Sequence, residues 1–377
     1  MKLKNLMKIK ISGPKIFVIT IIWLMVLVFV GTIEQKYIGL YAAQNKYFSS
    51  LILWIWYFPL PGGMLTMFVL TINLTVFLFK KNIWKKNNLG ILTIHIGVML
   101  LLLGAAVTYF FSQEGAMQIT TKNKTSNFIQ SYHDKELAII NLSEFQDSIE
   151  YTNFSEKILT IGNNITYLTI PFEMEILNYC NNSNLSAIKN KNELRQGNIA
   201  IHNDIECIDS EIEDSENKPA IKLYLKAKNN IYQNINGIYI SRLESNQNIQ
   251  KIDINGIEYV LIFQPKRTYL PFMVELIDVT KISHPNTQIA KSYTSEVNIL
   301  DNKQGRRQII EMNAPLRYKG YTFYQAHYEE DQMTGIKTSV FAVVKNYGRL
   351  FPYISSIIMC IGVLLQMLVR LPRLLKK

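Results

Sequence analysis

Four long runs of apolar residues constrain the fold of this 377-residue chain more than any other feature. They cover residues 16–33, 64–79, 91–111 and 350–369. A helix of about 20 predominantly apolar residues is long enough to cross the hydrocarbon core of a bilayer. The pattern therefore predicts an integral membrane protein with four transmembrane α-helices, three before and one after a long polar segment.

Basic residues mark one side of these predicted spans. Residues 1–15, 80–86 and 370–377 carry five, four and four lysines or arginines and no acidic residue. Positive charge is enriched in cytoplasmic loops and tails, and these three stretches share one side only if four helices cross. We therefore expect both termini in the cytoplasm. Because the whole chain nets only +11, these stretches account for its positive charge, which is not a nucleic-acid signal.

The same topology divides the chain into domains. We expect an N-terminal membrane module over residues 1–111 with an outer-face loop at 34–63, and an extracytoplasmic domain over 112–349. The last span and a basic tail would form residues 350–377. A cleaved signal peptide is the alternative for the first run. That run is long for a signal peptide and no A-x-A site follows it closely, so we interpret it as an uncleaved anchor.

Residues 112–349 have the pattern of an antiparallel β domain. Short runs of β-branched and aromatic residues, such as 258–263 and 295–300, are separated by Asn, Gly, Asp and Pro. Alternation with period two between such turn residues is typical of a sandwich or a barrel. Cys180 and Cys207 can pair in an oxidising compartment. The sequence contains no C-x-x-C, H-E-x-x-H or G-x-S-x-G motif.

The outer-face loop contains an apolar segment, residues 51–58, that is too short to span a bilayer. Trp54, Trp56 and Tyr57 within it are side chains that favour the boundary between water and lipid. The sequence Pro-Leu-Pro-Gly-Gly at residues 59–63 then marks a stop before the second span. Two interpretations follow: an interfacial or re-entrant segment on the outer face, or a simple aromatic anchor, which is the commoner feature and the one we favour.

His95 lies inside the uncharged run at residues 91–111. An ionisable side chain at membrane depth is costly to bury and commonly marks a functional site. The acceptor nitrogen of a neutral imidazole can bind a metal such as haem iron. The alternative is a hydrogen bond to Asn73, which lies at a similar depth in the second span and would join two helices without any ligand.

Gly90, Gly97 and Gly104 recur every seven residues in the same predicted span. They form a stripe along which another helix backbone can approach closely. His95 lies about 160° around the helix from Gly97. Both sides of this helix therefore need neighbours, and a partner membrane protein explains this best. A chance distribution of glycines is the alternative.

Short motifs at both ends of the chain carry a family resemblance. Near the beginning they are GLYAAQNKYF, PLPGG, LGILTIHIGVMLLLLG and EGAMQI; near the end they are LPFMVELIDV, SHPNTQIAKSYTSEVNI and IIEMNAPLRYKGYTFYQAHYE. They resemble the ResB family, also called CcsB, of system II cytochrome c maturation proteins. The resemblance covers roughly residues 16–142 and 268–370 and does not extend to 143–267. Family members usually carry small residues where this chain has Ala326 and His327, so His327 is not supported as a ligand.

The resemblance implies a function that the spacing of residues alone does not. Proteins of this family act with a second membrane protein, ResC or CcsA, to carry haem outward and attach it to apocytochrome c. A histidine in their third span is thought to be an axial ligand of haem iron, and His95 occupies the matching position. We therefore expect haem b as a transient, transported cargo. The expected partners are a ResC/CcsA-type protein, apocytochrome c, haem and membrane lipid, and no nucleic acid.

The resemblance also implies a place and a role. The chain would be a non-catalytic subunit of a holocytochrome c synthase complex in a bacterial inner membrane, with its large domain in the periplasm. A thylakoid membrane is the corresponding site if the chain is plastid-encoded. Two other classes remain open: a non-haem scaffold or sensor whose β domain binds a periplasmic partner, and a permease with four spans. Such permeases usually place their external domain after the first span.

Overall fold

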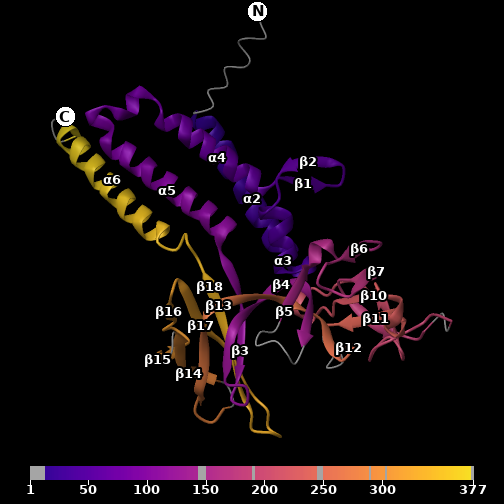
Figure 1. The fold of residues 1–377 in the computed structure, drawn as a ribbon. Helices are drawn as coiled ribbons and strands as arrows, with labels where there is room; N and C mark the ends of the chain where they lie inside the picture. The colour runs from indigo at the N-terminus through magenta and orange to yellow at the C-terminus, as the bar shows by residue number, and fades with distance from the viewer. Residues whose placement is uncertain are drawn as a thin grey trace, which may run out of the picture. The chain divides into compact units, whose positions relative to one another are not determined.

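The computed structural model describes residues 13–142, 150–188, 192–243, 249–287, 290–301 and 304–374 (Figure 1). The chain forms two compact units. The helical unit comprises Met1–Gln113, Tyr318–Tyr321 and Val344–Lys377, and the β unit comprises Glu114–Arg317 and Thr322–Val343. Some of the basic residues that predict the topology lie outside the described residues: Lys2, Lys4, Lys8, Lys10, Lys376 and Lys377.

Among its described residues, the helical unit contains three helices that are long and apolar enough to cross a membrane, as expected of a membrane protein. These are α2 (Pro14–Ile38), α5 (Leu89–Phe111) and α6 (Phe351–Leu374). Pro14 begins α2, where its missing N–H would have no helical partner in any case. With 25 residues, α2 is about 37 Å long, which exceeds the ~30 Å of a bilayer core.

The second predicted span forms a shorter helix, α4 (Gly63–Leu78). Its 16 residues give a length of about 24 Å, which is less than the thickness of the hydrocarbon core. Three long apolar helices are therefore confirmed, whereas a crossing by four helices stays a prediction. Two short 3₁₀ helices, η2 (Lys81–Trp84) and η3 (Lys86–Asn88), connect α4 to α5.

The segment between α2 and α4 folds into short elements. They are α3 (Leu40–Ala43), the π-helix η1 (Gln44–Phe48) and a hairpin of β1 (Ile52–Ile55) and β2 (Phe58–Pro61). Leu53 of β1 and Tyr47 of η1 pack with Leu27 of α2 in a small buried core. The hairpin is thus attached to α2 by apolar contacts.

The β unit is built from antiparallel strands, which confirms the β-rich prediction for this part of the chain. The strands of its largest sheet are β3 (Gln113–Thr120), β4 (Thr125–Leu142), β5 (Glu150–Ser155), β12 (Gln250–Ile254), β13 (Ile257–Ser283), β14 (Ala290–Asp301), β15 (Gln304–Glu311), β16 (Leu316–Tyr318), β17 (Tyr321–Glu330) and β18 (Lys337–Lys345). Their order is β15-β14-β13-β4-β3-β18-β17-β16, with β12 paired to β13 and β5 paired to β4.

Two smaller sheets complete the β unit. Their strands are β6 (Asn164–Thr166), β7 (Phe172–Cys180), β8 (Ser183–Ser186), β9 (Asp204–Cys207), β10 (Ala220–Ala227) and β11 (Gly237–Arg242). One sheet has the order β11-β10-β7-β6, and the other pairs β8 with β9. Three 3₁₀ helices lie between strands: η4 (Glu156–Ile158), η5 (Asp214–Glu216) and η6 (Asn230–Ile235).

The main core of the β unit lies between the four-stranded sheet and the neighbouring strands of the large sheet. Phe172 of β7 and Leu223 of β10 face Leu137 of β4 and Phe263 of β13, and all four side chains are fully buried. Alternate residues of each strand point into this core, as the period of two requires. The alternation in the sequence therefore marks the buried faces correctly.

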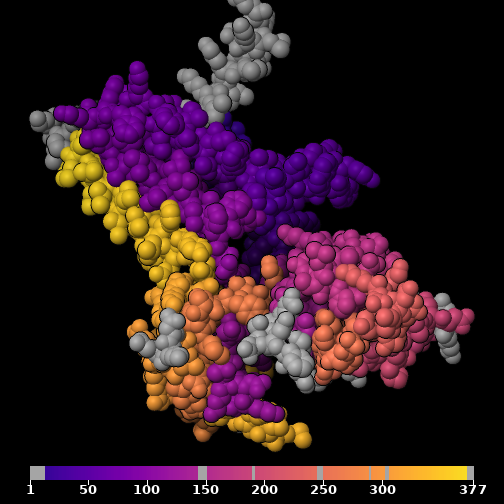
Figure 2. All heavy atoms as spheres, viewed as in Figure 1, coloured from indigo at the N-terminus to yellow at the C-terminus, as the bar shows by residue number. Residues whose placement is uncertain are grey.

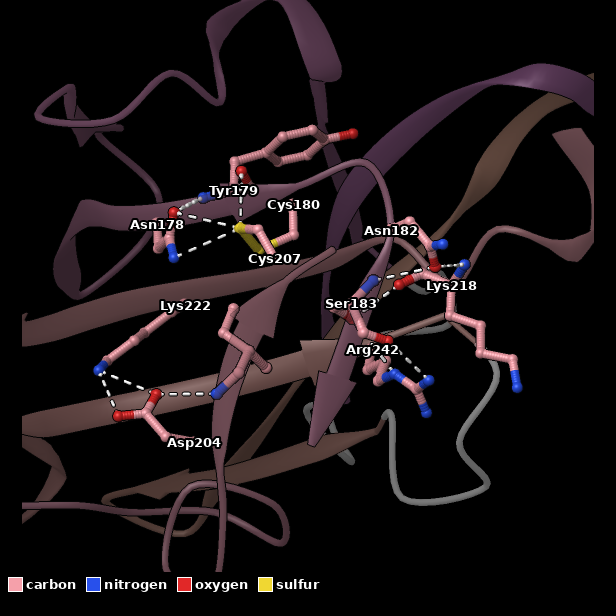
Figure 3. The surroundings of a disulfide bond; sticks show 11 residues. Asn178, Tyr179, Cys180, Asn182, Ser183, Asp204, Cys207, Lys218, Lys222 and Arg242 are labelled. Carbon is pink, nitrogen blue, oxygen red and sulfur yellow. Dashed lines mark hydrogen bonds and ion pairs between the residues drawn. A yellow bond between two sulfur atoms is a disulfide. The ribbon is translucent and has the colours of Figure 1, made fainter. Parts of the chain in front are cut away.

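A disulfide joins Cys180 at the end of β7 to Cys207 at the end of β9, with their Cα atoms 5.1 Å apart (Figure 3). The bond closes a segment of 27 residues that contains β8 and most of β9. Cys180 is buried among apolar side chains of a second, smaller core, which includes Ile205 and Ile240. The two cysteines that the sequence left as a candidate pair are therefore bonded.

Candidate functional site

His95 lies in the second turn of α5, and its ring makes one hydrogen bond within the same helix. Nδ1 lies 2.7 Å from the carbonyl oxygen of Ile91, one turn earlier. Because a carbonyl can only accept, Nδ1 must carry the hydrogen in this bond. In the neutral ring Nε2 is then the nitrogen with the free lone pair. Nε2 has no hydrogen-bond partner within the described residues.

The surroundings of the His95 ring are aromatic and apolar, with positive charge nearby. The ring of Phe77, near the end of α4, lies 4.7 Å from the imidazole centroid at an interplanar angle of 37°. The ammonium nitrogen of Lys80 lies 5.4 Å from the centroid of the same Phe77 ring. His95 itself is partly buried. The ligand-competent nitrogen therefore lies close to the basic connection between α4 and α5.

Asn73 of α4 uses its side chain in another direction. Its Nδ2 donates a hydrogen bond to the carbonyl oxygen of Gly13, at the start of α2, over 3.3 Å. Asn73 is buried, so this bond links α4 to α2 inside the helical unit. The alternative without a ligand expected Asn73 and His95 to bond to each other. In the structure His95 bonds to Ile91 and Asn73 bonds to Gly13.

The glycine stripe of α5 faces α6. A Cβ atom added to Gly90 would contact the backbone of Gln366, and one added to Gly97 would lie 2.6 Å from Cγ of Met359. At Gly104 the added atom would meet the side chain of Phe351. Since real Cβ atoms do not approach other atoms this closely, the absence of side chains at these positions lets α6 lie against α5. The chain's own last helix therefore packs on the glycine side of α5, and a partner protein on the His95 side stays a prediction.

Two polar contacts fix the antiparallel register of this helix pair. Oε1 of Gln366 accepts a hydrogen bond of 3.2 Å from the backbone N–H of Ile91, in the first turn of α5, where no helical acceptor exists. Near the other end, the hydroxyl of Thr108 donates to Oδ1 of Asn346 over 3.0 Å. Ile91 is also the residue whose carbonyl accepts from His95, so α6 helps to hold the turn that orients the imidazole.

The β1–β2 hairpin is a feature that the sequence did not reveal. Its tip is a two-residue turn, Trp56–Tyr57, in which Trp56 has φ of +56°. Glycine or asparagine usually signals such a turn, and neither is present. The indole nitrogen of Trp23 on α2 donates a hydrogen bond of 2.8 Å to the carbonyl oxygen of Pro61 in β2. Tryptophan at position 23 within an apolar helix was the available signal for a polar contact there.

Gln325, in the motif IIEMNAPLRYKGYTFYQAHYE near the end of the chain, belongs to a buried polar cluster. The hydroxyl of Ser295 donates to Oε1 of Gln325 over 2.6 Å, and Nε2 of Gln325 donates to the hydroxyl of Ser339 over 3.0 Å. The three residues come from β14, β17 and β18, and all are buried. Satisfied buried networks of this kind fix the relative positions of strands. The cluster has a structural role in the β unit.

The remaining histidines lie at the surface of the β unit. Nδ1 of His133 lies 2.7 Å from a carboxylate oxygen of Asp214, and Nε2 of His327 lies 3.3 Å from Glu329. No group of three or more His, Cys, Asp or Glu residues that could hold a metal ion occurs among the residues with described positions. His95 is therefore the candidate ligand that the geometry singles out.

Comparison with known proteins agrees with the motifs near the end of the chain. Residues 246–342 match the sequence model of the family described as ResB-like family. The chain is also similar to protein NrfI of Wolinella succinogenes, with 22% identity over 316 residues. This match covers 83% of the chain and 30% of NrfI, so the chain spans less than a third of the length of this relative. Together the two matches support the predicted assignment of the chain to the ResB-like family.

Proposed function

We propose that this chain is a membrane subunit of cytochrome c biogenesis that holds haem through Nε2 of His95 while the haem is passed to apocytochrome c. The observation that carries the proposal is the hydrogen bond from Nδ1 of His95 to the Ile91 carbonyl oxygen. That bond fixes the ring orientation and leaves the lone pair on the opposite nitrogen. A histidine held in this way is prepared to bind iron.

The residues around His95 suit a porphyrin. Haem iron binds neutral imidazole, and the porphyrin faces favour apolar contacts. Phe77 places an aromatic ring beside the imidazole. The haem propionates are anionic at neutral pH, and the lysines of the α4–α5 connection, Lys80 first among them, would attract them electrostatically. His95, Phe77 and Lys80 thus supply a ligand, a packing surface and a charge partner for the cargo.

One imidazole supplies one axial ligand. In the proposal the second axial ligand comes from a membrane partner of the ResC/CcsA type, the class of protein with which ResB proteins handle haem. The attachment of haem to apocytochrome c belongs to the complex of the two proteins. The complex would lie in a bacterial inner membrane, with both termini of this chain in the cytoplasm and its β unit in the periplasm. Similarity to the ResB-like family and to NrfI supports this proposal.

The visible absorption spectrum of the chain purified with its partner tests the proposal. We expect a Soret band in the wild type that is lost in His95→Ala and restored when imidazole is added to His95→Gly. The matched control is His327→Ala, since His327 is exposed and far along the chain in the β unit. It should leave the band unchanged.

The opposite result has a clear form. An unchanged Soret band in His95→Ala, together with normal maturation of cytochromes c in cells that carry this variant, would contradict the proposal. His95 would then have only a structural role. A complex without any Soret band would instead favour the alternative, a non-haem scaffold or sensor whose β unit binds a partner.

A further inference from the structure

The β1–β2 hairpin lies beside the middle of α2. The indole of Trp23 donates to the carbonyl oxygen of Pro61, and Leu53 packs against Leu27. At a rise of 1.5 Å per residue, Trp23 lies about 10 Å from one end of the apolar run at residues 16–33 and about 15 Å from the other. If α2 crosses the bilayer, the base of the hairpin is therefore at the depth of the hydrocarbon core.

The register of α4 is consistent with this depth. Asn73 donates to Gly13, so the two residues lie at one level. Gly63, the first residue of α4, is ten residues before Asn73, and Trp23 is ten residues after Gly13. Because α4 runs antiparallel to α2, both Gly63 and Trp23 lie about 15 Å from that level. The hairpin thus interrupts a helical path in the middle of the bilayer, which also explains why α4 is short.

Two backbone N–H groups along one edge of this hairpin have no acceptor among the described residues. The N–H of Gly62 donates to the Leu51 carbonyl oxygen, and bonded and non-bonded pairs alternate along an antiparallel ladder. The pairs Ile52–Pro61 and Trp54–Pro59 are therefore non-bonded, with the N–H groups of Ile52 and Trp54 pointing away from β2. No described residue accepts from these two groups. On β2 the corresponding positions are prolines, which have no N–H.

Lipid cannot satisfy such an edge. The bilayer core offers no hydrogen-bond partners, so non-helical backbone at this depth occurs only where protein covers it or where it lines a water-filled cavity. Water is a poor neighbour for this hairpin, because the side chains of Trp54, Trp56, Tyr57 and Phe58 are 61%, 90%, 92% and 72% exposed. Figure 1 shows the hairpin projecting from the side of α2 and α4, and Figure 2 shows it protruding from the helical unit. Protein is the remaining cover.

We propose that the β1 edge and the aromatic tip of this hairpin form the docking surface for a partner integral membrane protein, inside the bilayer. The partner places hydrogen-bond acceptors opposite the N–H groups of Ile52 and Trp54 and apolar side chains around Trp56. That this partner is the ResC/CcsA-type protein rests on the proposed function; the position of the surface does not.

Site-specific photocrosslinking in native membranes tests the surface. A benzoylphenylalanine is placed at Trp56, and in a second variant at Met25 on α2, which is 66% exposed and two residues from Trp23, hence at a similar depth. The partner carries an epitope tag. We expect the residue at position 56 to form a covalent adduct with the tagged partner in at least several-fold higher yield than the residue at position 25. Adducts with lipid alone, or with a second copy of this chain, would overturn the proposal.

A pair of substitutions at Ile52 tests the backbone edge itself. Ile52→Pro removes the outward N–H at a position that makes no bond within the hairpin, whereas Ile52→Ala removes most of the side chain and keeps the N–H. The adduct formed from position 56 should fall several-fold in Ile52→Pro and stay near its original yield in Ile52→Ala. Equal yields in the two variants would show that the edge is not a hydrogen-bonding site.

The outcome is separable from that of the proposed function. A His95-dependent Soret band together with lipid adducts at position 56 means that haem ligation stands and the docking surface fails. An adduct with the partner in a complex that has no Soret band means the reverse.

Discussion

Gly90 of α5 and Gly362 of α6 meet backbone to backbone. A Cβ atom added to Gly90 would lie 2.6 Å from the carbonyl oxygen of Gly362, and one added to Gly362 would lie 2.9 Å from the carbonyl oxygen of Gly90. The two helices come from opposite ends of the sequence, and both the first turn of α5 and the carbonyl that orients His95 lie at this crossing. Their packing is therefore tied to the candidate site.

Gly90→Ala should loosen this helix pair. The added methyl group would contact the backbone of Gln366, which cannot move aside as a side chain can. Overpacking of this kind costs about 1–3 kcal/mol. Unfolding of the purified chain in mixed detergent micelles, followed by circular dichroism, should show the loss. Ala106→Val, which adds methyl groups at an exposed position of the same helix, is the control, and an equal effect of the two changes would contradict the packing argument.

Phe77→Ala should speed the loss of haem from the complex. The Phe77 ring lies against the imidazole of His95, so its removal exposes one side of the ligand and deletes a contact surface for the porphyrin. We expect the rate of haem transfer to an excess of an apo-haem-protein acceptor to rise several-fold. Phe79→Ala changes the same residue type two positions further on, where the ring is 82% exposed, and should leave the rate unchanged. Identical rates in the wild type and Phe77→Ala would show that Phe77 does not contact the bound haem.

The long helices could be predicted because apolar length is a local property of the sequence. The runs at residues 91–111 and 350–369 correspond to α5 (Leu89–Phe111) and α6 (Phe351–Leu374), with ends shifted by at most a few residues. His95 could be singled out for the same reason, since one polar residue in an apolar run is visible without a fold. Its hydrogen bond to the backbone carbonyl of Ile91 was not predicted, because the side chains of its helical neighbours cannot bond and the partner was expected from another helix, another subunit or a ligand.

The neighbours of these elements could not be predicted in the same way. The sequence showed the glycine stripe of α5 but not that α6, more than 240 residues later, lies along it. The β1–β2 hairpin was hidden because its turn has no glycine or asparagine, and because Pro59 and Pro61 ordinarily argue against a strand. These prolines are compatible with β2 because both occupy positions whose backbone nitrogen points away from β1, so that no hydrogen bond of the hairpin is lost.

Loss of the Cys180–Cys207 disulfide should destabilise the part of the β unit that contains β8 and β9. The bond closes a 27-residue segment, and the chain-entropy model gives about 3–4 kcal/mol for a loop of this size. Hydrogen exchange of peptides from β8 and β9 should become faster in Cys207→Ser, and in the wild type after reduction. Cys360→Ser, which removes the free cysteine of α6, is the matched control. Unchanged exchange in Cys207→Ser would show that the surrounding core holds these strands without the bond.

Asp204 should make the stability of the β unit depend on pH in the acidic range. Burial raises the pKa of Asp204, but hydrogen bonds from Arg195 and Lys222, at 2.7 and 3.0 Å, lower it more, so that the pKa in the folded chain is below its usual value. A depressed pKa contributes stability above the pKa of the unfolded chain, near 3.8, and this contribution is lost as the pH falls through the folded value.

The expected signature is a difference between two variants. Relative to Asp204→Asn, the wild type should be more resistant to urea at neutral pH, and this advantage should shrink as the pH is lowered from about 5 to below the folded pKa. Hydrogen exchange of peptides from β9 and β10 measures the local stability. Tryptophan fluorescence would not report on it, because the four tryptophans all lie in the helical unit. Glu206→Gln removes a nearby exposed carboxylate and should not reproduce the effect. An advantage that stays constant down to the lowest pH would mean that the ion pairs with Arg195 and Lys222 do not stabilise the folded chain.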